Sequence, residues 1–169
     1  MKKLILVRHA KSSWKDASLD DHDRPLNKRG ERDAPHMGKV VKDKKVKPDL
    51  IVSSTALRAY STAKEFAKKL DYPKSDILRM KELYLAELDG LTEIVKNLDD
   101  KDETVFLFGH NPGITWLANY LSGESVENVP TSGVFAMQFD IESWKEVAAG
   151  NGALSFFLYP KMYFKDAED

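Results

Sequence analysis

The sequence contains no cysteine among its 169 residues. A chain without cysteine forms no disulfide, has no thiolate to act as a nucleophile and offers no thiolate ligand to a metal ion. Disulfide-stapled proteins, cysteine-dependent enzymes and zinc–thiolate proteins are therefore excluded.

Two further features are absent, namely an excess of charge of one sign and a long apolar run. Lysine and arginine number 26 and aspartate and glutamate number 27, so the uncompensated basic surface of a general nucleic-acid binder is not expected. The first apolar run, in MKKLILVRHA, stops at Arg8 and His9 and is too short for a signal peptide or a membrane span. We therefore expect a cytoplasmic protein with no nucleic-acid partner and no membrane partner.

The sequence does contain an alternation of short apolar runs with longer amphipathic segments. This pattern is typical of an α/β domain with a largely parallel sheet. The hydrophobic fraction of 42% and the charged fraction of 31% are ordinary for one soluble domain of this length. We predict a three-layer α/β/α sandwich over residues 1–160 and a charged C-terminal tail over residues 161–169 that frays.

Six runs are predicted as strands because they are apolar or alternate with a period of two. The first is apolar on both faces, which is typical of a central strand covered by helices, and the last is expected at a sheet edge. The predicted strands are Lys3–Arg8, Asp49–Ser53, Ile77–Met80, Thr104–Gly109, Val134–Asp140 and Gly152–Tyr159.

Four helices are predicted between these strands from amphipathic spacing and capping residues. The first follows Asn27 as its cap, and it either kinks at Pro35 or restarts there with Asp33 as a new cap. Asn111 is expected to cap the last helix, with Pro112 in its first turn. The predicted ranges are 28–45, 55–70 with Ser54 or Thr55 as the cap, 91–98 and 112–121.

Arginine, histidine and glutamate residues stand where the predicted strands end. Arg8 ends the first strand and His9 directly follows it, and Arg58 lies in the first turn of the helix after the second strand. Glu82 follows the third strand and His110 follows the fourth. Because the carboxyl ends of the strands in an open α/β sheet line one crevice, we expect these five side chains to converge on a single site.

This set of residue types suits phosphoryl transfer, which needs a nucleophile, fixed positive charge around the phosphoryl oxygens and an acid for the leaving group. Arginine presents a planar fork of donors to phosphate, and a helix start adds unpaired N–H groups beside Arg58. A neutral histidine attacks phosphorus, and neighbouring arginines favour the neutral form. We expect the other ring nitrogen of His9 to donate to a carbonyl, and His110 to be protonated as an additional phosphate donor.

Five sequence blocks carry a resemblance to a known family, and they read LVRHAKSSW, SSTALRAYSTA, KELYLAE, FGHNPG and PTSGV. In this order and at these separations, they resemble the histidine phosphatase superfamily, also called the phosphoglycerate mutase-like superfamily. With the DRPLNKRG block, the pattern is most similar to the small phosphohistidine phosphatases. The resemblance extends from about Lys3 to Asp140, and five ordered blocks are a far stronger signal than one Arg-His pair.

By this resemblance the fold is phosphoglycerate mutase-like, His9 is the phosphoryl acceptor, and Arg8, Arg58 and His110 form the phosphate pocket. The implied reaction passes through a covalent phosphohistidine intermediate, with no metal and no cofactor. Glu82 occupies the position at which mutases and broad phosphatases of the superfamily place a proton donor. Phosphohistidine phosphatases need this donor less, because imidazole is a less basic leaving group than an alkoxide.

The sequence also departs from the mutase pattern. Ala10 and Lys11 stand where mutases have glycine and glutamate, Lys15 stands where they often have asparagine, and the insertions that enclose a sugar phosphate are missing. A short, open site fits a phosphoryl group carried by a protein, such as the histidine domain of a phosphorelay. Three alternatives remain: a phosphatase for small phosphomonoesters with Glu82 as its acid, a non-catalytic phospho-ligand binding module, and a metal-dependent hydrolase.

The other unusual residues are interpreted as structural. His22, in the acidic loop DDHD, and His36 are expected to be structural or solvated, since one histidine in a flexible loop is a weak metal ligand set. Arg24 is expected to form a salt bridge within this loop. The three tryptophans are expected to bury surface, and only Trp14 is placed where it could line the mouth of the site. The lysines from Lys42 to Lys47 are expected to be a solvated helix end.

Overall fold

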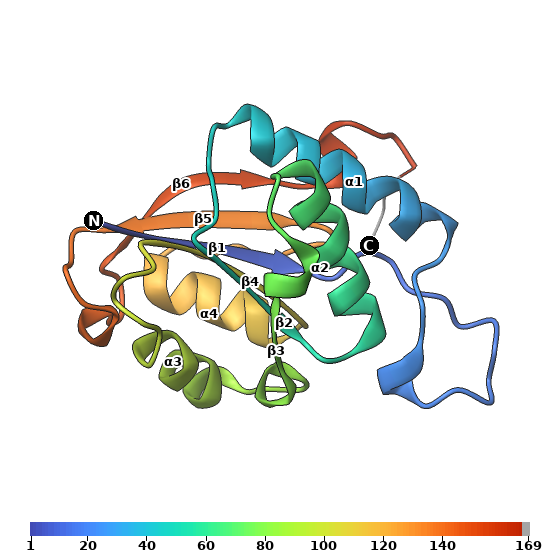
Figure 1. Ribbon diagram of the computed structural model, residues 1–169, viewed down its shortest axis with the longest axis horizontal. Helices are drawn as coiled ribbons and strands as arrows, with labels where there is room; N and C mark the ends of the chain where they lie inside the picture. Colours follow the sequence, from blue (N-terminus) through green and yellow to red (C-terminus); the bar gives the residue numbers. More distant parts are fainter. Residues whose placement is uncertain (167–169) are drawn as a thin grey trace.

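The computed structural model describes residues 1–166 and contains a six-stranded sheet with helices on both faces (Figure 1). The strands are β1 (Lys2–Arg8), β2 (Leu50–Ser54), β3 (Leu78–Met80), β4 (Thr104–Gly109), β5 (Val134–Phe139) and β6 (Gly152–Leu158). Their order across the sheet is β3-β2-β4-β1-β5-β6. The first four pair in parallel and β5 is antiparallel to both of its neighbours, so the prediction of a three-layer fold with a mostly parallel sheet is confirmed.

The strand that precedes His9 lies in the interior of the sheet. β1 pairs with β4 on one side and with β5 on the other. Leu4, Ile5, Leu6 and Val7 are all buried, because both faces of β1 are covered. The short β3 and the C-terminal β6 occupy the two edges, as predicted for β6.

Four helices complete the layers (Figure 1). They are α1 (Lys28–Asp43), α2 (Leu57–Lys69), α3 (Leu88–Lys96) and α4 (Gly113–Ser122). α1 and α2 pack on one face of the sheet and bury Met37 and Phe66 against it. α3 and α4 pack on the other face, where Leu91 and Leu117 are buried. The two hydrophobic layers fix the sheet and thereby the position of its strand ends.

The first helix is continuous through Pro35. The side chain of Asn27 accepts a hydrogen bond from the Gly30 N–H at 2.9 Å and caps the helix as predicted. Asp33 does not restart the helix, because it lies buried inside α1 and pairs with Arg32 at 2.9 Å. The apolar face of α1 continues across the proline to Met37, so packing against the sheet holds one helix.

The other helices begin close to the predicted residues. α2 begins at Leu57 after Ala56, although Ser54 Oγ still accepts a hydrogen bond from the Ala56 N–H. α4 begins at Gly113, and Asn111 Oδ1 caps it from outside by accepting from the Thr115 N–H at 3.1 Å. α3 begins at Leu88, three residues before the predicted start.

The segment that follows β6 packs against α1. The rings of Tyr163 and Phe164 lie 5.0 and 4.7 Å from the ring of His36, and Arg32 binds Asp166 at 2.9 Å. The expected fraying therefore does not describe residues 161–166, and residues 167–169 lie outside the described part. The domain boundary at residue 160 stays a prediction.

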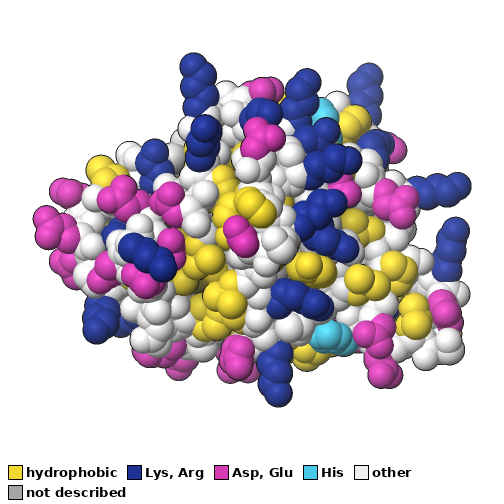
Figure 2. Space-filling view, viewed as in Figure 1, with side chains coloured by type: hydrophobic (Ala, Val, Ile, Leu, Met, Phe, Trp, Pro, Cys, Tyr) yellow, Lys and Arg dark blue, Asp and Glu magenta, His cyan; other side chains and the backbone are white. Residues whose placement is uncertain are grey.

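Charge is unevenly distributed over the surface. Lysine and arginine side chains gather over α1 and α2, whereas acidic side chains gather at the end of the sheet where β1 begins (Figure 2). The lysines between Lys42 and Lys47 are exposed, as expected for a solvated helix end. Within residues 1–166, no helix has the length and apolar character needed to cross a membrane.

Candidate active site

The register of the parallel sheet brings His9 and His110 together. Arg8, the last residue of β1, pairs with Gly109, the last residue of β4, and the His9 N–H donates to the Gly109 carbonyl at 3.0 Å. Each histidine is the next residue of its strand, so the two rings leave the sheet side by side. Their centroids are 5.1 Å apart, although the residues are far apart in sequence.

A cavity of about 590 Å³ opens above these strand ends. Four of the five predicted site residues contribute to its lining, which confirms the expected convergence for Arg8, His9, Arg58 and His110. The complete lining is Arg8, His9, Lys11, Ser12, Trp14, Asp21, Arg24, Arg58, Tyr84, Leu85, His110, Asn111 and Thr131.

The ring of His9 is held in one tautomer. Its Nδ1 lies 2.8 Å from the Ala10 carbonyl oxygen, which only accepts, so Nδ1 donates and the lone pair is on Nε2. The Ala10 N–H in turn donates to Thr62 Oγ1 at 2.9 Å and fixes the turn. Burial lowers the pKa of His9 well below its ordinary value, and the nearby His110 and Arg58 lower it further. His9 is therefore neutral, with a nucleophilic nitrogen available.

His110 is neutral as well, contrary to the expectation of a protonated donor. Burial and, after it, the positive charge of Arg58 lower the pKa of His110 to about 3. Its Nε2 lies 2.8 Å from Ser54 Oγ. Within residues 1–166 its Nδ1 is buried without a hydrogen-bond partner. The neighbouring arginines were visible in the sequence, but the burial of His110 was not. The arginines and the burial both disfavour the protonated form of His110.

Arg58 is oriented by Asp21, which was not among the predicted site residues. Nη1 and Nη2 of Arg58 donate to the main-chain carbonyl and to Oδ2 of Asp21 at 2.6 and 2.9 Å. The Tyr84 hydroxyl donates to the same Oδ2 at 2.6 Å. Burial opposes ionisation of Asp21, but the hydrogen bonds from Tyr84 and Arg58 hold the pKa of its carboxyl well below the usual range. Asp21 is therefore a fixed anion that positions a cation.

The loop after β1 is fastened by Arg24. Its Nε donates to Asp21 Oδ1 at 3.1 Å, which confirms the predicted salt bridge within the loop, and its Nη1 donates to Ser12 Oγ at 2.7 Å. The guanidinium carbon lies 3.5 Å from the ring centroid of Trp14. This stacking places Trp14 at the mouth of the cavity, as the sequence suggested.

The PTSGV block, residues 130–134, packs against the end of β1 beside Arg8 and His9. Nη1 of Arg8 donates to the Val129 carbonyl at 3.2 Å. The Ser132 N–H lies 3.1 Å from the carbonyl oxygens of both Arg8 and His9. Ser132 has a φ of 59°, a left-handed conformation that turns the chain sharply next to His9.

The structure does not bring Glu82 into the cavity. Glu82 is exposed in a short turn over Lys81–Leu83, and the cavity is lined instead by Tyr84 and Leu85 from the same loop. The assignment of Glu82 to the end of the third strand was correct, but β3 is only three residues long and lies at the sheet edge. The chain must cross from that edge before it reaches the site, so later residues arrive there.

The family model of the histidine phosphatase superfamily (branch 1) matches residues 4–131. The chain belongs to this superfamily. An uncharacterised chloroplastic protein of Arabidopsis thaliana is 36% identical over 159 residues, which cover 89% of this chain and 72% of that protein. Phosphoglycerate mutase 1 of Saccharomyces cerevisiae is 33% identical over 125 residues, which cover 71% of this chain but only 47% of the mutase.

A solved structure of similar fold carries a more specific name. It is from Agrobacterium tumefaciens and is named for the phosphohistidine phosphatase SixA, with a TM-score of 0.81 and 27% identity. The match covers 94% of this chain and 98% of that one. This histidine phosphatase superfamily member therefore has the phosphoglycerate mutase-like fold expected from the sequence, in the compact form of the SixA structures.

The remaining histidines and tryptophans do not line the cavity. His22 contacts Thr55 Oγ1 through Nε2 at 2.8 Å, and His36 packs on aromatic rings, so both are structural. Trp144 is fully buried as predicted, whereas Trp116 is 47% exposed on α4, contrary to prediction. Within residues 1–166, no group of three or more histidine or acidic side chains is arranged to hold a metal ion.

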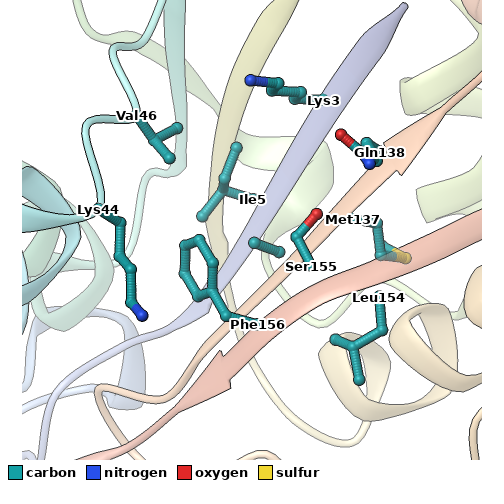
Figure 3. A pocket seen from close by; sticks show the side chains of 10 residues that line it. Lys3, Ile5, Lys44, Val46, Met137, Gln138, Leu154, Ser155 and Phe156 are labelled. Atoms are coloured by element: carbon teal, nitrogen blue, oxygen red, sulfur yellow. The ribbon is translucent and has the colours of Figure 1, made fainter.

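A second hollow of about 510 Å³ lies on the sheet face near the start of β1 (Figure 3). Lys3 and Ile5 of β1, Lys44 at the end of α1, and Phe156 of β6 point into this region. No histidine or carboxylate lines it. Ser155 is its one hydroxyl among the described lining residues and has no histidine or carboxylate beside it in the lining to activate it, so the cavity above His9 is the candidate active site.

Proposed function

We propose that this protein is a metal-independent phosphatase that transfers a phosphoryl group from a protein phosphohistidine to His9 and then hydrolyses it. Membership in the histidine phosphatase superfamily supports the phosphatase activity. The SixA-named structure of similar fold supports phosphohistidine as the substrate class. The geometry of the cavity supports both proposals, and the lack of a protonated carboxylic acid among its described lining residues favours phosphohistidine over a phosphate ester.

One observation carries the choice of substrate. Among the described residues that line the cavity, Asp21 is the only one with a carboxyl group, and its bonds to Arg58 and Tyr84 keep it ionised. An ionised carboxylate has no proton to give, and Glu82 is exposed outside the cavity. The described lining of the cavity therefore offers no carboxylic acid to protonate an alkoxide leaving group. Imidazole leaves without such an acid when the second nitrogen of the phosphorylated ring is protonated, because the ring then departs as neutral imidazole.

In the first step, the lone pair on Nε2 of His9 forms a bond to phosphorus. The bond between phosphorus and the substrate imidazole, whose other ring nitrogen is protonated, breaks, and that imidazole leaves as a neutral ring with the bonding electron pair. His9 retains its Nδ1 proton, because the Ala10 carbonyl accepts it in a hydrogen bond of 2.8 Å. The Ala10 carbonyl also stabilises the positive charge that the ring acquires on phosphorylation.

Arg8, Arg58 and His110 hold the phosphoryl oxygens during transfer. Both arginines line the cavity beside His9, and their fixed charges match the negative charge that spreads over the equatorial oxygens. The unpartnered Nδ1 of His110 supplies an N–H donor when Ser54 Oγ donates to Nε2. A neutral histidine serves here as a donor, so no protonation step is needed.

In the second step, a water oxygen attacks the phosphorus of phosphorylated His9. The bond to Nε2 breaks, the electron pair returns to the ring, and phosphate leaves with both protons of the water. Neutral His9 is restored in its original tautomer. The low pKa of His9, which burial causes, makes the ring a good leaving group in this step.

The test follows phosphate release from a phosphohistidine-bearing protein domain in the presence of excess chelator. The wild type is expected to release phosphate and to carry a transient phosphoryl group, detected by intact-protein mass spectrometry under alkaline quench. The His9→Ala variant is expected to do neither. Glu82→Gln is the matched control, and it is expected to retain activity because Glu82 lies outside the cavity.

A phosphatase for small phosphomonoesters is the second candidate, and the 33% identity to a phosphoglycerate mutase favours it. This candidate predicts the opposite pattern. The wild type would then hydrolyse alkyl phosphates but not the phosphohistidine domain, and Glu82→Gln would lose the ester activity. Activity that disappears in chelator would contradict both candidates.

A further inference from the structure

The two most exposed large hydrophobic side chains of residues 1–166 line the same cavity. Trp14 is 74% exposed and Leu85 is 67% exposed, and both contribute to the cavity that contains His9. They come from different segments, the loop after β1 and the loop between β3 and α3. Exposed apolar side chains that gather at one functional opening mark a surface that another molecule covers.

Trp14 is held in place before any other molecule arrives. The Arg24 guanidinium stacks on its ring at 3.5 Å, and Arg24 is itself fixed by Asp21 and by Ser12. A rigid aromatic surface loses little conformational entropy on association. Tryptophan and arginine are also the residue types that contribute most to the binding energy of protein interfaces.

Leu85 is exposed at an energetic cost to the free protein. Its φ of 59° is left-handed, a region that a residue with a branched side chain rarely adopts. Strained backbone of this kind persists where the surrounding structure holds it and is concentrated at binding sites. Leu85 directly follows Tyr84, whose hydroxyl is bound to Asp21, so the same contact that orients Arg58 also presents Leu85.

The depth of the nucleophile determines what must contact this rim. His9 is only 8% exposed, so the phosphoryl group has to reach the floor of the cavity. A phosphohistidine side chain extends only one methylene and one ring from its backbone before the phosphoryl group. The backbone that carries it must therefore come down to the rim, where Trp14 and Leu85 are exposed.

We propose that Trp14 and Leu85 form the docking rim for the folded protein domain that carries the phosphohistidine. This inference rests on the proposed function and names its specificity-determining residues. The occupant is a protein surface with apolar side chains around an exposed phosphohistidine, and it buries both residues when the phosphoryl group reaches His9. Small phosphorylated compounds enter the cavity without covering the rim.

The test compares a phosphohistidine-bearing protein domain with phosphoramidate, a small compound that contains the same phosphorus–nitrogen bond. For Trp14→Ala and for Leu85→Gly, the ratio of kcat/KM on the protein to kcat/KM on phosphoramidate is expected to fall about tenfold, mainly through KM. Glycine suits the left-handed φ at position 85, so the second variant removes the side chain without destabilising the loop. Trp14→Phe is expected to recover most of the ratio.

Trp116→Ala is the matched control, because Trp116 is also exposed but lies on α4 outside the catalytic cavity. It is expected to leave the ratio unchanged. A ratio that stays constant in both rim variants, or that falls equally in Trp116→Ala, would overturn the proposal.

Binding separates this inference from the proposed function. In a His9→Ala background, which cannot turn over, calorimetry with the phosphorylated domain is expected to show about tenfold weaker binding after Trp14→Ala. Equal affinity with and without Trp14 would contradict the docking rim even if turnover is observed. A wild type that binds the domain through Trp14 but releases no phosphate would contradict the proposed function and leave the docking rim supported.

Discussion

Arg58 Nη2 donates a hydrogen bond of 2.9 Å to Asp21 Oδ2, across 37 positions of sequence. Asp21 lies in a short turn of the loop after β1, and Arg58 lies in the first turn of α2. The carboxylate also accepts from Tyr84 and Arg24. The Asp21 carboxylate therefore positions the guanidinium groups of Arg58 and Arg24 and the hydroxyl of Tyr84 in the lining of the cavity.

Replacing Asp21 with asparagine is expected to lower kcat/KM by roughly tenfold to a hundredfold. The amide carries no charge to hold Arg58, and a small displacement of a phosphate-binding group has a large effect on rate. Phosphate inhibition should weaken in parallel, which a steady-state inhibition constant measures. Asp23→Asn is the control, since Asp23 lies in the same turn and, within residues 1–166, forms an ion pair only with His22. Equal losses in both variants would show that the loop as a whole is disturbed.

The strands of the sheet and four of the residues that line the cavity could be predicted from the sequence, because the ends of strands can be located from the apolar runs. His9 and His110 each follow a run of buried residues, and the parallel register then fixes their proximity. Nothing in the local sequence connected Asp21 to Arg58, since the contact depends on how the loop after β1 folds back over α2. The error at Glu82 has the same origin, because the route of a loop from an edge strand is set by tertiary packing.

Charge states were predicted less well than positions. The arginines around His110 were visible as residue types, but its burial became known only from the packing of β4 against its neighbours. Burial and neighbouring cations both lower the pKa of a histidine, so His110 is neutral rather than protonated.

Ser54→Ala is expected to impair both stability and catalysis. Ser54 Oγ is fully buried and lies 2.8 Å from His110 Nε2, so its removal leaves a buried ring nitrogen unpaired. We expect a loss of about 1–3 kcal/mol in the free energy of unfolding together with a lower kcat.

Ser53→Ala is the matched control: Ser53 is equally buried on β2, but its hydroxyl donates only to the Ser54 carbonyl. It should lose stability while it retains kcat, and a normal kcat in Ser54→Ala would show that His110 needs no support.

The free energy of unfolding is expected to decrease as the pH falls below about 6.5. Burial lowers the pKa of His9 well below this value and that of His110 to about 3, so the unfolded chain binds more protons than the folded one. The stability is then complete above about pH 6.5 and is lost between there and about pH 3 for His110. Each histidine contributes a slope of up to about 1.4 kcal/mol per pH unit.

Urea denaturation at about pH 5 and about pH 7 measures this slope. The wild type is expected to be less stable at the lower pH, and His110→Asn should reduce the difference because it removes one of the two groups. An identical pH dependence in the wild type and the variant would mean that His110 is protonated in the folded protein.

Gly30→Ala tests how closely the loop after β1, which begins at His9, approaches α1. A Cβ at residue 30 would lie 2.2 Å from the Lys11 carbonyl oxygen, and this oxygen is a backbone atom that also accepts from the Asn27 N–H. The loop two residues after His9 must therefore move. We expect a loss of about 1–3 kcal/mol in the free energy of unfolding and a lower rate of phosphate release.

Gly90→Ala is the matched control, because Gly90 is also the third residue of its helix and a Cβ there meets nothing within 4 Å. Alanine is favoured over glycine within a helix by about 1 kcal/mol, so Gly90→Ala should raise the melting temperature and preserve activity. If Gly30→Ala also raised the melting temperature, the close contact between α1 and the loop after β1 would not exist in solution.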